Sequence, residues 1–185
     1  MNLGQSMLVI AAMALLGFLA LSANSSVMDS SQTSDNSEFG VTAVSLATSV
    51  IQEAMSKMFD QVTVTTGAIT DSSLLTPSPF WMHRDAGEHY RGGANDFDDI
   101  SDFDSLLFVY TSPLDPLPEP GADTTIIVPG IRDRYFVRTR VQYVDPNNLD
   151  HVVTGPTWHK RIVVTVTSSS PRRDTIAIPA VMSYW

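Results

Sequence analysis

The chain opens with an unbroken apolar segment. Residues 7–23 (MLVIAAMALLGFLALSA) contain no ionisable side chain, and the first charged residue is Asp29. At about 1.5 Å per residue, a helix over the uncharged stretch from Met1 to Met28 would cross the roughly 30 Å hydrocarbon layer of a membrane. The pattern therefore predicts a long hydrophobic helix at the N-terminus.

An amphipathic helix pattern follows and ends near Asp60. Its polar positions include Gln52, Glu53, Ser56 and Lys57. Its apolar positions recur at spacings of three and four, as on one helix face. These positions are Ala43, Val44, Ala47, Val50, Ile51, Ala54, Met55 and Met58.

Residues 24–38 (NSSVMDSSQTSDNSE) separate the two apolar blocks and are rich in Ser, Thr, Asp and Asn. Such side chains compete for backbone hydrogen bonds and favour caps and turns. The composition leaves open whether this stretch is helical or locally melted.

After Asp60 the pattern changes from helical to alternating, which predicts a β-rich body. Short strands are expected at 61–66 (QVTVTT), 106–111 (LLFVYT) and 124–128 (TTIIV). The expected fold class is α+β, with a long helix packed on a small antiparallel sheet. The expected division is an assembly helix over 1–60 and a globular body over 61–185.

The clearest predicted hairpin joins residues 134–144 to residues 160–167 (KRIVVTVT). In the first strand Arg138, Arg140 and Gln142 share one face. The opposite face carries Tyr135, Val137, Thr139, Val141 and Tyr143. Residues 145–148 (DPNN) have turn chemistry between the two strands. Residues 174–185 supply a last strand, in which Pro179 indicates an edge or a bulge.

The composition argues against several classes of function. The chain has 185 residues, no cysteine and a net charge of -9. The absence of cysteine excludes disulfides, thiolate metal sites and thiol catalysis. The acidic balance argues against nucleic-acid binding and against anionic lipid, because both require a positive field.

Charge is segregated along the body: ten of the eleven charged residues between Asp85 and Asp123 are acidic, whereas bases predominate between Arg132 and Asp174. Ordinary ion pairs on the solvated surface would explain this segregation, and each would contribute under about 1 kcal/mol to stability. In a polymer, complementary patches could instead set the register between copies. The candidate basic residues for such contacts are Arg138, Arg140, Arg172 and Arg173.

The loop NDFDDISDFD at 95–104 carries closely spaced carboxylates, which suits a calcium ion or an acidic contact between copies. The alternative is an ordinary acidic loop anchored by two aromatic residues, Phe97 and Phe103. The spacing does not match an EF-hand, so calcium is a candidate and no cofactor is expected otherwise. The candidate residues are Asp96, Asp98, Asp99, Asp102 and Asp104.

Catalysis is not expected. His83, Asp85, Glu88 and His89 lie close together, but their spacing fits no zinc helix motif. The sequence has no phosphate-binding glycine loop and no nucleophile elbow. His151 and His159 are expected at the surface or in the hairpin.

An uncharged apolar N-terminal helix, an amphipathic extension and a small β-rich body together resemble type IV pilins and the related pseudopilins. Two alignments stay open. With Met1 as the mature first residue, Gln5 takes the position of the family's usual glutamate. In a precursor, Gly4 would precede the prepilin peptidase cut and Gln5 would become the new N-terminus.

The resemblance implies a structural subunit of an extracellular filament that passes through an inner-membrane stage. Its partners would be copies of itself and the pilus assembly machinery. Small residues at 11, 12, 14, 17, 20 and 23 would let such helices pack closely. The candidate assembly residues are Met1, Gln5, Met7, Leu8, Val9, Ile10, Ala11, Ala12, Leu15, Leu16, Phe18 and Leu19.

Two other interpretations of the N-terminus remain. It could be a plain single-pass anchor for a binding or secretion-associated domain. It could also be a cleaved secretory signal with small residues at 20–22, although residues 1–6 lack the basic side chains of a signal's start.

Overall fold

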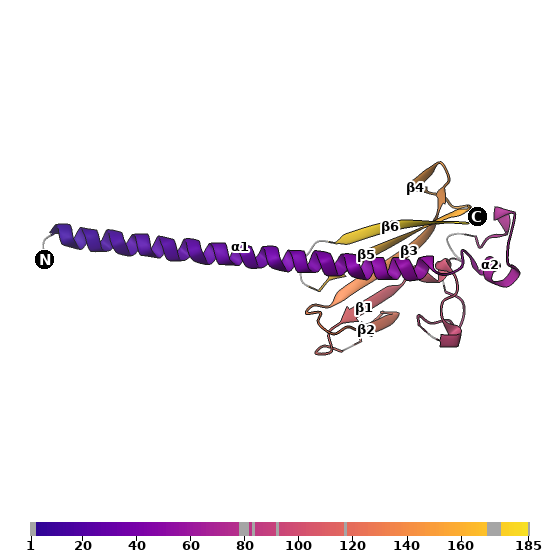
Figure 1. Ribbon diagram of the computed structural model, residues 1–185, viewed down its shortest axis with the longest axis horizontal. Helices are drawn as coiled ribbons and strands as arrows, with labels where there is room; N and C mark the ends of the chain where they lie inside the picture. Colours follow the sequence, from indigo (N-terminus) through magenta and orange to yellow (C-terminus); the bar gives the residue numbers. More distant parts are fainter. Residues whose placement is uncertain are drawn as a thin grey trace. The chain divides into compact units, whose positions relative to one another are not determined.

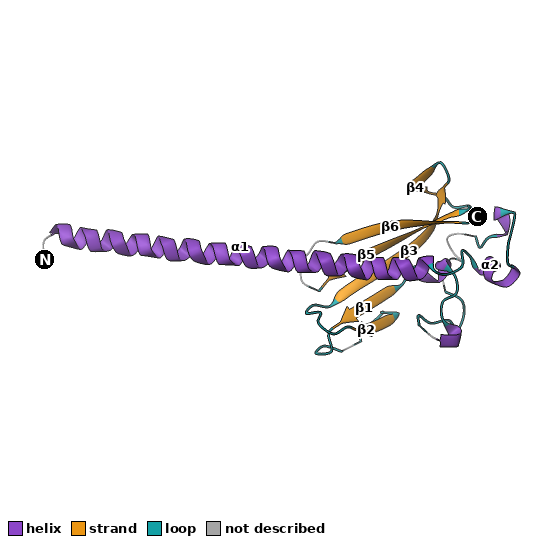
Figure 2. Cartoon of the chain, in the orientation of Figure 1, coloured by secondary structure: helices purple, strands orange, loops and turns teal. Residues whose placement is uncertain are grey.

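The computed structural model describes residues 3–77, 82, 84–91, 93–116, 118–169 and 175–184. The chain forms two compact units, Met1–Gly40 and Val41–Trp185. The first is helical, and the second combines helix with a six-stranded sheet (Figures 1 and 2). The predicted α+β class is confirmed.

Helix α1 (Leu3–Met55) has 53 residues and includes the Ser-rich stretch at 24–38. Hydroxyl groups in this stretch bond to the helix itself: Thr33 Oγ1 donates to Asp29 O, and Ser37 Oγ donates to Thr33 O, both at 2.9 Å. These polar side chains therefore have partners within the helix and do not interrupt it.

Within the second unit, the last turns of α1 bury one narrow stripe. The stripe consists of Ala43, Ala47, Val50 and Ala54, which are fully buried. Three of these four residues are alanine. Two residues predicted on this apolar face lie outside it, because Val44 is 45% exposed and Met58 is 48% exposed.

The strand predicted at 61–66 is wrong: these residues form helix α2 (Gln61–Thr66). Asp60 caps its start by accepting from Val62 N at 3.1 Å, and Thr63 Oγ1 accepts from Asp60 N at 3.1 Å. This capping box satisfies free N–H groups of the first turn and outweighs the β preference of the sequence. Three short 3₁₀ helices follow: η1 (Ser72–Leu74), η2 (Gly93–Asn95) and η3 (Ile100–Phe103).

The sheet has the order β2-β1-β3-β5-β6, and β4 pairs with β3. Its strands are β1 (Leu107–Thr111), β2 (Thr124–Ile127), β3 (Tyr135–Asp145), β4 (Asn148–Val152), β5 (His159–Ser168) and β6 (Ile176–Ser183). Pairing is antiparallel except between β1 and β2, which are parallel. The β1–β2 pair departs from the expected antiparallel sheet, because the loop after Thr111 is long enough to return the chain to the start of β1.

The predicted β3–β5 pairing is confirmed over nine residue pairs from Tyr135–Ser168 to Tyr143–Lys160. The predicted faces of β3 are also confirmed, since the aromatic, valine and threonine positions are buried and Arg138 and Arg140 are exposed. Pro179 lies in β6 opposite Val163, and β6 is an edge strand as expected. Strand β4 was not predicted, because all its residues are exposed and polar residues predominate.

Candidate functional sites

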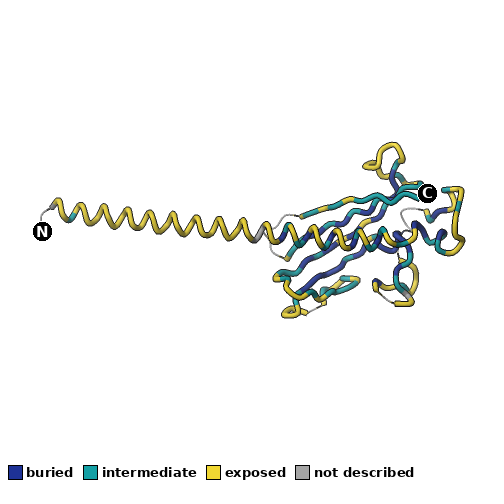
Figure 3. The backbone as a smooth tube through the Cα atoms, in the orientation of Figure 1, coloured by how far each residue is buried: buried dark blue, intermediate teal, exposed yellow. Residues whose placement is uncertain are grey.

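The first candidate site is the apolar part of α1. Its most hydrophobic 18-residue window has none of its residues buried within the chain. This helix is long and apolar enough to span a membrane, by length and composition. Figure 3 shows its exposed course. Large exposed side chains include Met7, Leu8, Val9, Ile10, Leu15, Leu16, Phe18 and Leu19.

The other predicted positions on this helix agree with that exposure. Gly4, Gln5, Ala11 and Ala12 are exposed, whereas Met1 lies outside the described residues. Apart from its two chain neighbours and the nearby backbone of α1, a Cβ atom added at Gly17 would meet no atom within 4 Å. Packing within this chain therefore does not require this glycine.

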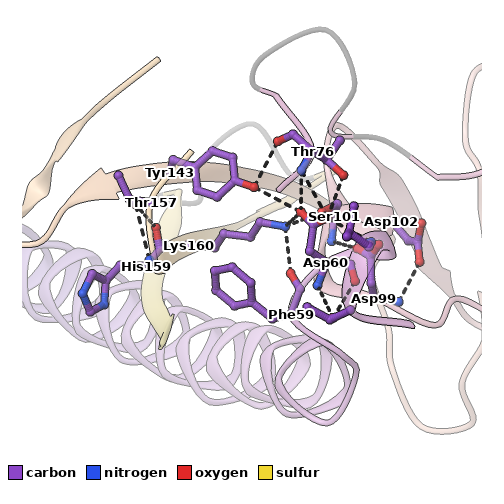
Figure 4. Close-up of polar contacts among 12 residues, drawn as sticks. Phe59, Asp60, Thr76, Asp99, Ser101, Asp102, Tyr143, Thr157, His159 and Lys160 are labelled. Atoms are coloured by element: carbon purple, nitrogen blue, oxygen red, sulfur yellow. Dashed lines mark hydrogen bonds and ion pairs between the residues drawn. The ribbon is translucent and has the colours of Figure 1, made fainter. Parts of the chain in front are cut away.

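The second candidate site is a buried ionic cluster centred on Lys160 of β5 (Figure 4). The side chains of Lys160 and Asp60 have no exposed surface, and Nζ and Oδ2 lie 2.7 Å apart. Lys160 Nζ also donates to Phe59 O and Ser101 Oγ, each at 2.7 Å. Three acceptors match the three N–H bonds of an ammonium group.

Asp60 joins four parts of the second unit. It follows α1, caps α2 and accepts from Thr76 Oγ1 at 2.7 Å. It also accepts from the hydroxyl of Tyr143 in β3 at 3.1 Å. Burial alone would raise the pKa of Asp60, but the charge of Lys160 and the hydrogen bonds around the carboxylate lower it. Burial in turn lowers the pKa of Lys160, against the opposing charges of Asp60 and Asp99. Lys160 and Asp60 form an ion pair, because each N–H bond of the ammonium group has an acceptor.

Two further carboxyl groups beside this pair behave differently. Burial, with the nearby charge of Asp102, raises the pKa of Asp99 to about 7 against the opposing charge of Lys160. Burial, with the neighbouring Glu88, raises the pKa of Asp102 to about 7. The ammonium group of Lys160 thus stabilises one ionised carboxylate, that of Asp60. The carboxyl groups of Asp99 and Asp102 stay protonated up to near neutral pH.

These raised values predict that stability falls as pH rises. An unfolded Asp has a pKa near 3.8, so between about pH 4 and pH 7 the folded state binds more protons than the unfolded state. Each such carboxyl then lowers the free energy of unfolding by up to about 1.4 kcal/mol per pH unit. Asp99→Asn should flatten this slope, because an amide keeps the acceptor for Ser101 N without titrating. Denaturant unfolding of the full chain at pH 4 to 8 measures it.

A matched control is Asp150→Asn, since the Asp150 side chain is 95% exposed. It should leave the pH slope of the wild-type protein unchanged. An equal slope in wild type and Asp99→Asn would contradict the assignment of the raised pKa to Asp99.

Most carboxylates of the acidic loop accept hydrogen bonds from N–H groups of the same chain. Asp99 caps η3, and Asp102 Oδ2 accepts from Asp98 N and Asp99 N, both at 3.0 Å. Asp104 Oδ1 accepts from Val141 N at 2.7 Å, which attaches the loop to β3. Two aromatic residues also anchor the loop: Phe97 and Phe103 are buried, with ring centroids 5.2 Å apart.

Three carboxyl groups nevertheless gather beside this loop. Oxygen atoms of Glu88, Asp98 and Asp102 all lie within 4.8 Å of one another, so among the described residues this group could hold a cation. A hydrogen bond between Glu88 and Asp102 already joins two of them, and burial raises the pKa of Glu88. A proton can therefore relieve the repulsion in this group at or below neutral pH.

Residues at the end of α1 and just after it hold the 90–96 segment in place. Lys57 Nζ lies 3.1 Å from Asp96 Oδ2, and Arg91 lies 3.3 Å from Glu53. The hydroxyl of Tyr90 also donates to Glu53. The polar positions of the amphipathic helix thus fasten the 90–96 segment.

The predicted basic residues on β3 share the outward face of the sheet. Arg138 and Arg140 are exposed there, and Arg172 and Arg173 lie outside the described residues. Of the predicted histidine group, His83 is outside the described residues and His89 is exposed, as is His151. His159 Nδ1 lies 2.8 Å from Ser183 Oγ, across the β5–β6 pair.

Sequence reasoning did not identify the ionic cluster, although one signal pointed to it. The alternation of β5 places Lys160 on the same face as Ile162 and Val164, which are buried. A lysine on the buried face of a strand requires an acidic partner. The location of that partner, 100 residues earlier, could not be read from the pattern.

Comparison with known proteins finds no family model, no curated protein and no solved structure that matches this chain.

Proposed function

We propose that this protein is a non-catalytic structural subunit of a type IV pilus-like filament and that it polymerises through the apolar part of α1. The observation that carries the proposal is the exposure of this helix. None of its most hydrophobic window is buried within the chain. Removing apolar surface from water is worth about 25 cal/mol per Å², so this helix needs either lipid or other copies.

Two features favour other copies of this chain, rather than lipid, as the final environment of the apolar part of α1. Small residues are spread along the helix, and Gly17 serves no packing purpose within the subunit. Close helix–helix approach is the usual role of such residues. In addition, α1 continues without a break into the turns that pack on the sheet, so the body is joined to the assembly segment by regular helix. Lipid would serve as the environment before assembly, in the inner membrane.

The test starts from the full-length chain purified in detergent. Detergent is removed in the absence and in the presence of lipid vesicles, and the samples are examined by negative-stain microscopy and by vesicle flotation. We expect filaments in the lipid-free sample. A chain that floats with vesicles and forms only irregular aggregates without them would instead be a membrane-anchored domain. Native protein that begins near Asn24 by N-terminal sequencing would be a secreted protein whose signal had been removed.

A further inference from the structure

A groove on the outward face of the sheet is the feature that the filament proposal leaves unexplained. Its volume is about 520 Å³. It lies where the residues just before β1 meet the outward face of β3 and β5. Its lining includes Ser105, Leu106, Arg138, Arg140, Val163 and Thr165. The groove therefore combines an apolar part, Leu106 and Val163, with two guanidinium groups.

These two arginines have no ion-pair partner among the described residues. Arg138 and Arg140 alternate on β3, so both point outward, next to each other on one face. Other described arginines do find acids: Arg84 with Asp123, Arg134 with Glu119, and Arg161 with Asp150. Two adjacent unpaired cations in a chain of net charge -9 indicate a surface suited to an acidic partner.

The other end of β1 carries a complementary projection. Leu114 is 95% exposed, and it lies in a short turn after the strand. The turn is held by bonds from Asp115 N to Ser112 O at 3.0 Å and from Thr111 Oγ1 to Asp115 O. Asp115 and Glu119 place two carboxylates there against the single guanidinium of Arg134. This turn therefore presents one apolar side chain, Leu114, which we call the knob. The charge beside it, from Asp115, Glu119 and Arg134, is net negative.

We infer that Leu114 of one copy of this chain inserts into the Arg138/Arg140 groove of the next copy, with Leu106 and Val163 around it. The acidic flank beside Leu114 would face the two arginines. The knob follows the C-terminal end of β1 and the groove adjoins its N-terminal end, so the two surfaces differ. A contact between unlike surfaces is head-to-tail and adds copies without closing on a pair. This inference rests on the proposed filament, for which it supplies a contact outside the helices.

The absence of cysteine permits a direct test by cross-linking. Full-length Leu114→Cys/Val163→Cys is assembled after detergent removal, oxidised mildly and run on a non-reducing gel. We expect a ladder of disulfide-linked multimers, and dimers when the two single-cysteine chains are mixed. The matched control mixes Leu114→Cys with Asp150→Cys, an exposed position on β4, and should give at least tenfold less cross-linked product. Adding Arg138→Glu and Arg140→Glu to the double-cysteine chain should reduce the ladder by a similar factor.

The outcomes separate this contact from the filament itself. Filaments that form with no more cross-linking than the control overturn the groove contact and leave the proposed function in place. Cross-links without filaments support the contact and overturn assembly through α1. The absence of both filaments and cross-links overturns both. Far-UV circular dichroism of each variant confirms that the fold is retained.

Discussion

Replacing Lys160 with methionine should lower the free energy of unfolding by about 3–5 kcal/mol, because it leaves a buried carboxylate without its counter-charge. The methionine fills a similar volume, so the loss reports charge and hydrogen bonding more than packing. Asp60 would keep its bonds to Thr76 and Tyr143 but lose the cation that holds it ionised. Denaturant unfolding of the full chain in detergent, followed by tryptophan fluorescence and by far-UV circular dichroism, measures the change.

A control and a double variant make this result specific. Lys57→Met removes a more exposed pair, with Asp96, and should cost about 1 kcal/mol or less. Lys160→Met combined with Asp60→Asn should recover part of the loss, since the remaining side chain no longer carries a buried charge. A loss below about 1 kcal/mol in Lys160→Met alone would contradict the central role of the ion pair.

Ala12→Asp should abolish filament formation. A carboxylate at the centre of an apolar helix costs about 2.5–3.5 kcal/mol in an apolar environment, and every 1.4 kcal/mol is a factor of about ten in association. The amount of sedimentable polymer should therefore fall by about 100-fold or more. Sedimentation after detergent removal, with negative-stain microscopy of the pellet, measures the effect.

The matched control is Ser31→Asp, which adds the same charge to the same helix beyond its apolar part, where Asp29 already lies. This variant should assemble as the wild-type chain does. Normal fibres from Ala12→Asp would show that the helix is not packed in a dry core.

Alternation and helical spacing were sufficient to predict most of the regular elements. They identified the N-terminal helix, the β3–β5 pair and both faces of β3, and they gave an edge as one of two alternatives for Pro179, because each depends on local pattern. They failed at residues 61–66, where β-branched side chains suggested a strand. A single capping aspartate, set by its tertiary bonds to Lys160 and Tyr143, determined the helix instead.

The candidate sites were predicted less completely. The sequence named apolar side chains of α1 as candidate assembly residues, and the structure shows that these side chains are exposed. The acidic loop was identified as a cluster, but its internal use depends on bonds such as Asp104 to Val141 N in β3. The groove beside Arg138 could not be predicted, since it forms where the start of β1 lies beside β3, and its lining extends to β5.

The edges of the sheet limit how copies of this protein can join. Pro179 in β6 has no N–H group, and strand prolines are found where that side of the strand faces solvent. The opposite edge, β2, has only four residues. Neither edge offers a long row of free donors on which another chain could build a continuing cross-β stack. The two edges therefore disfavour amyloid-like growth, and the proposed filament would depend on contacts between side-chain surfaces.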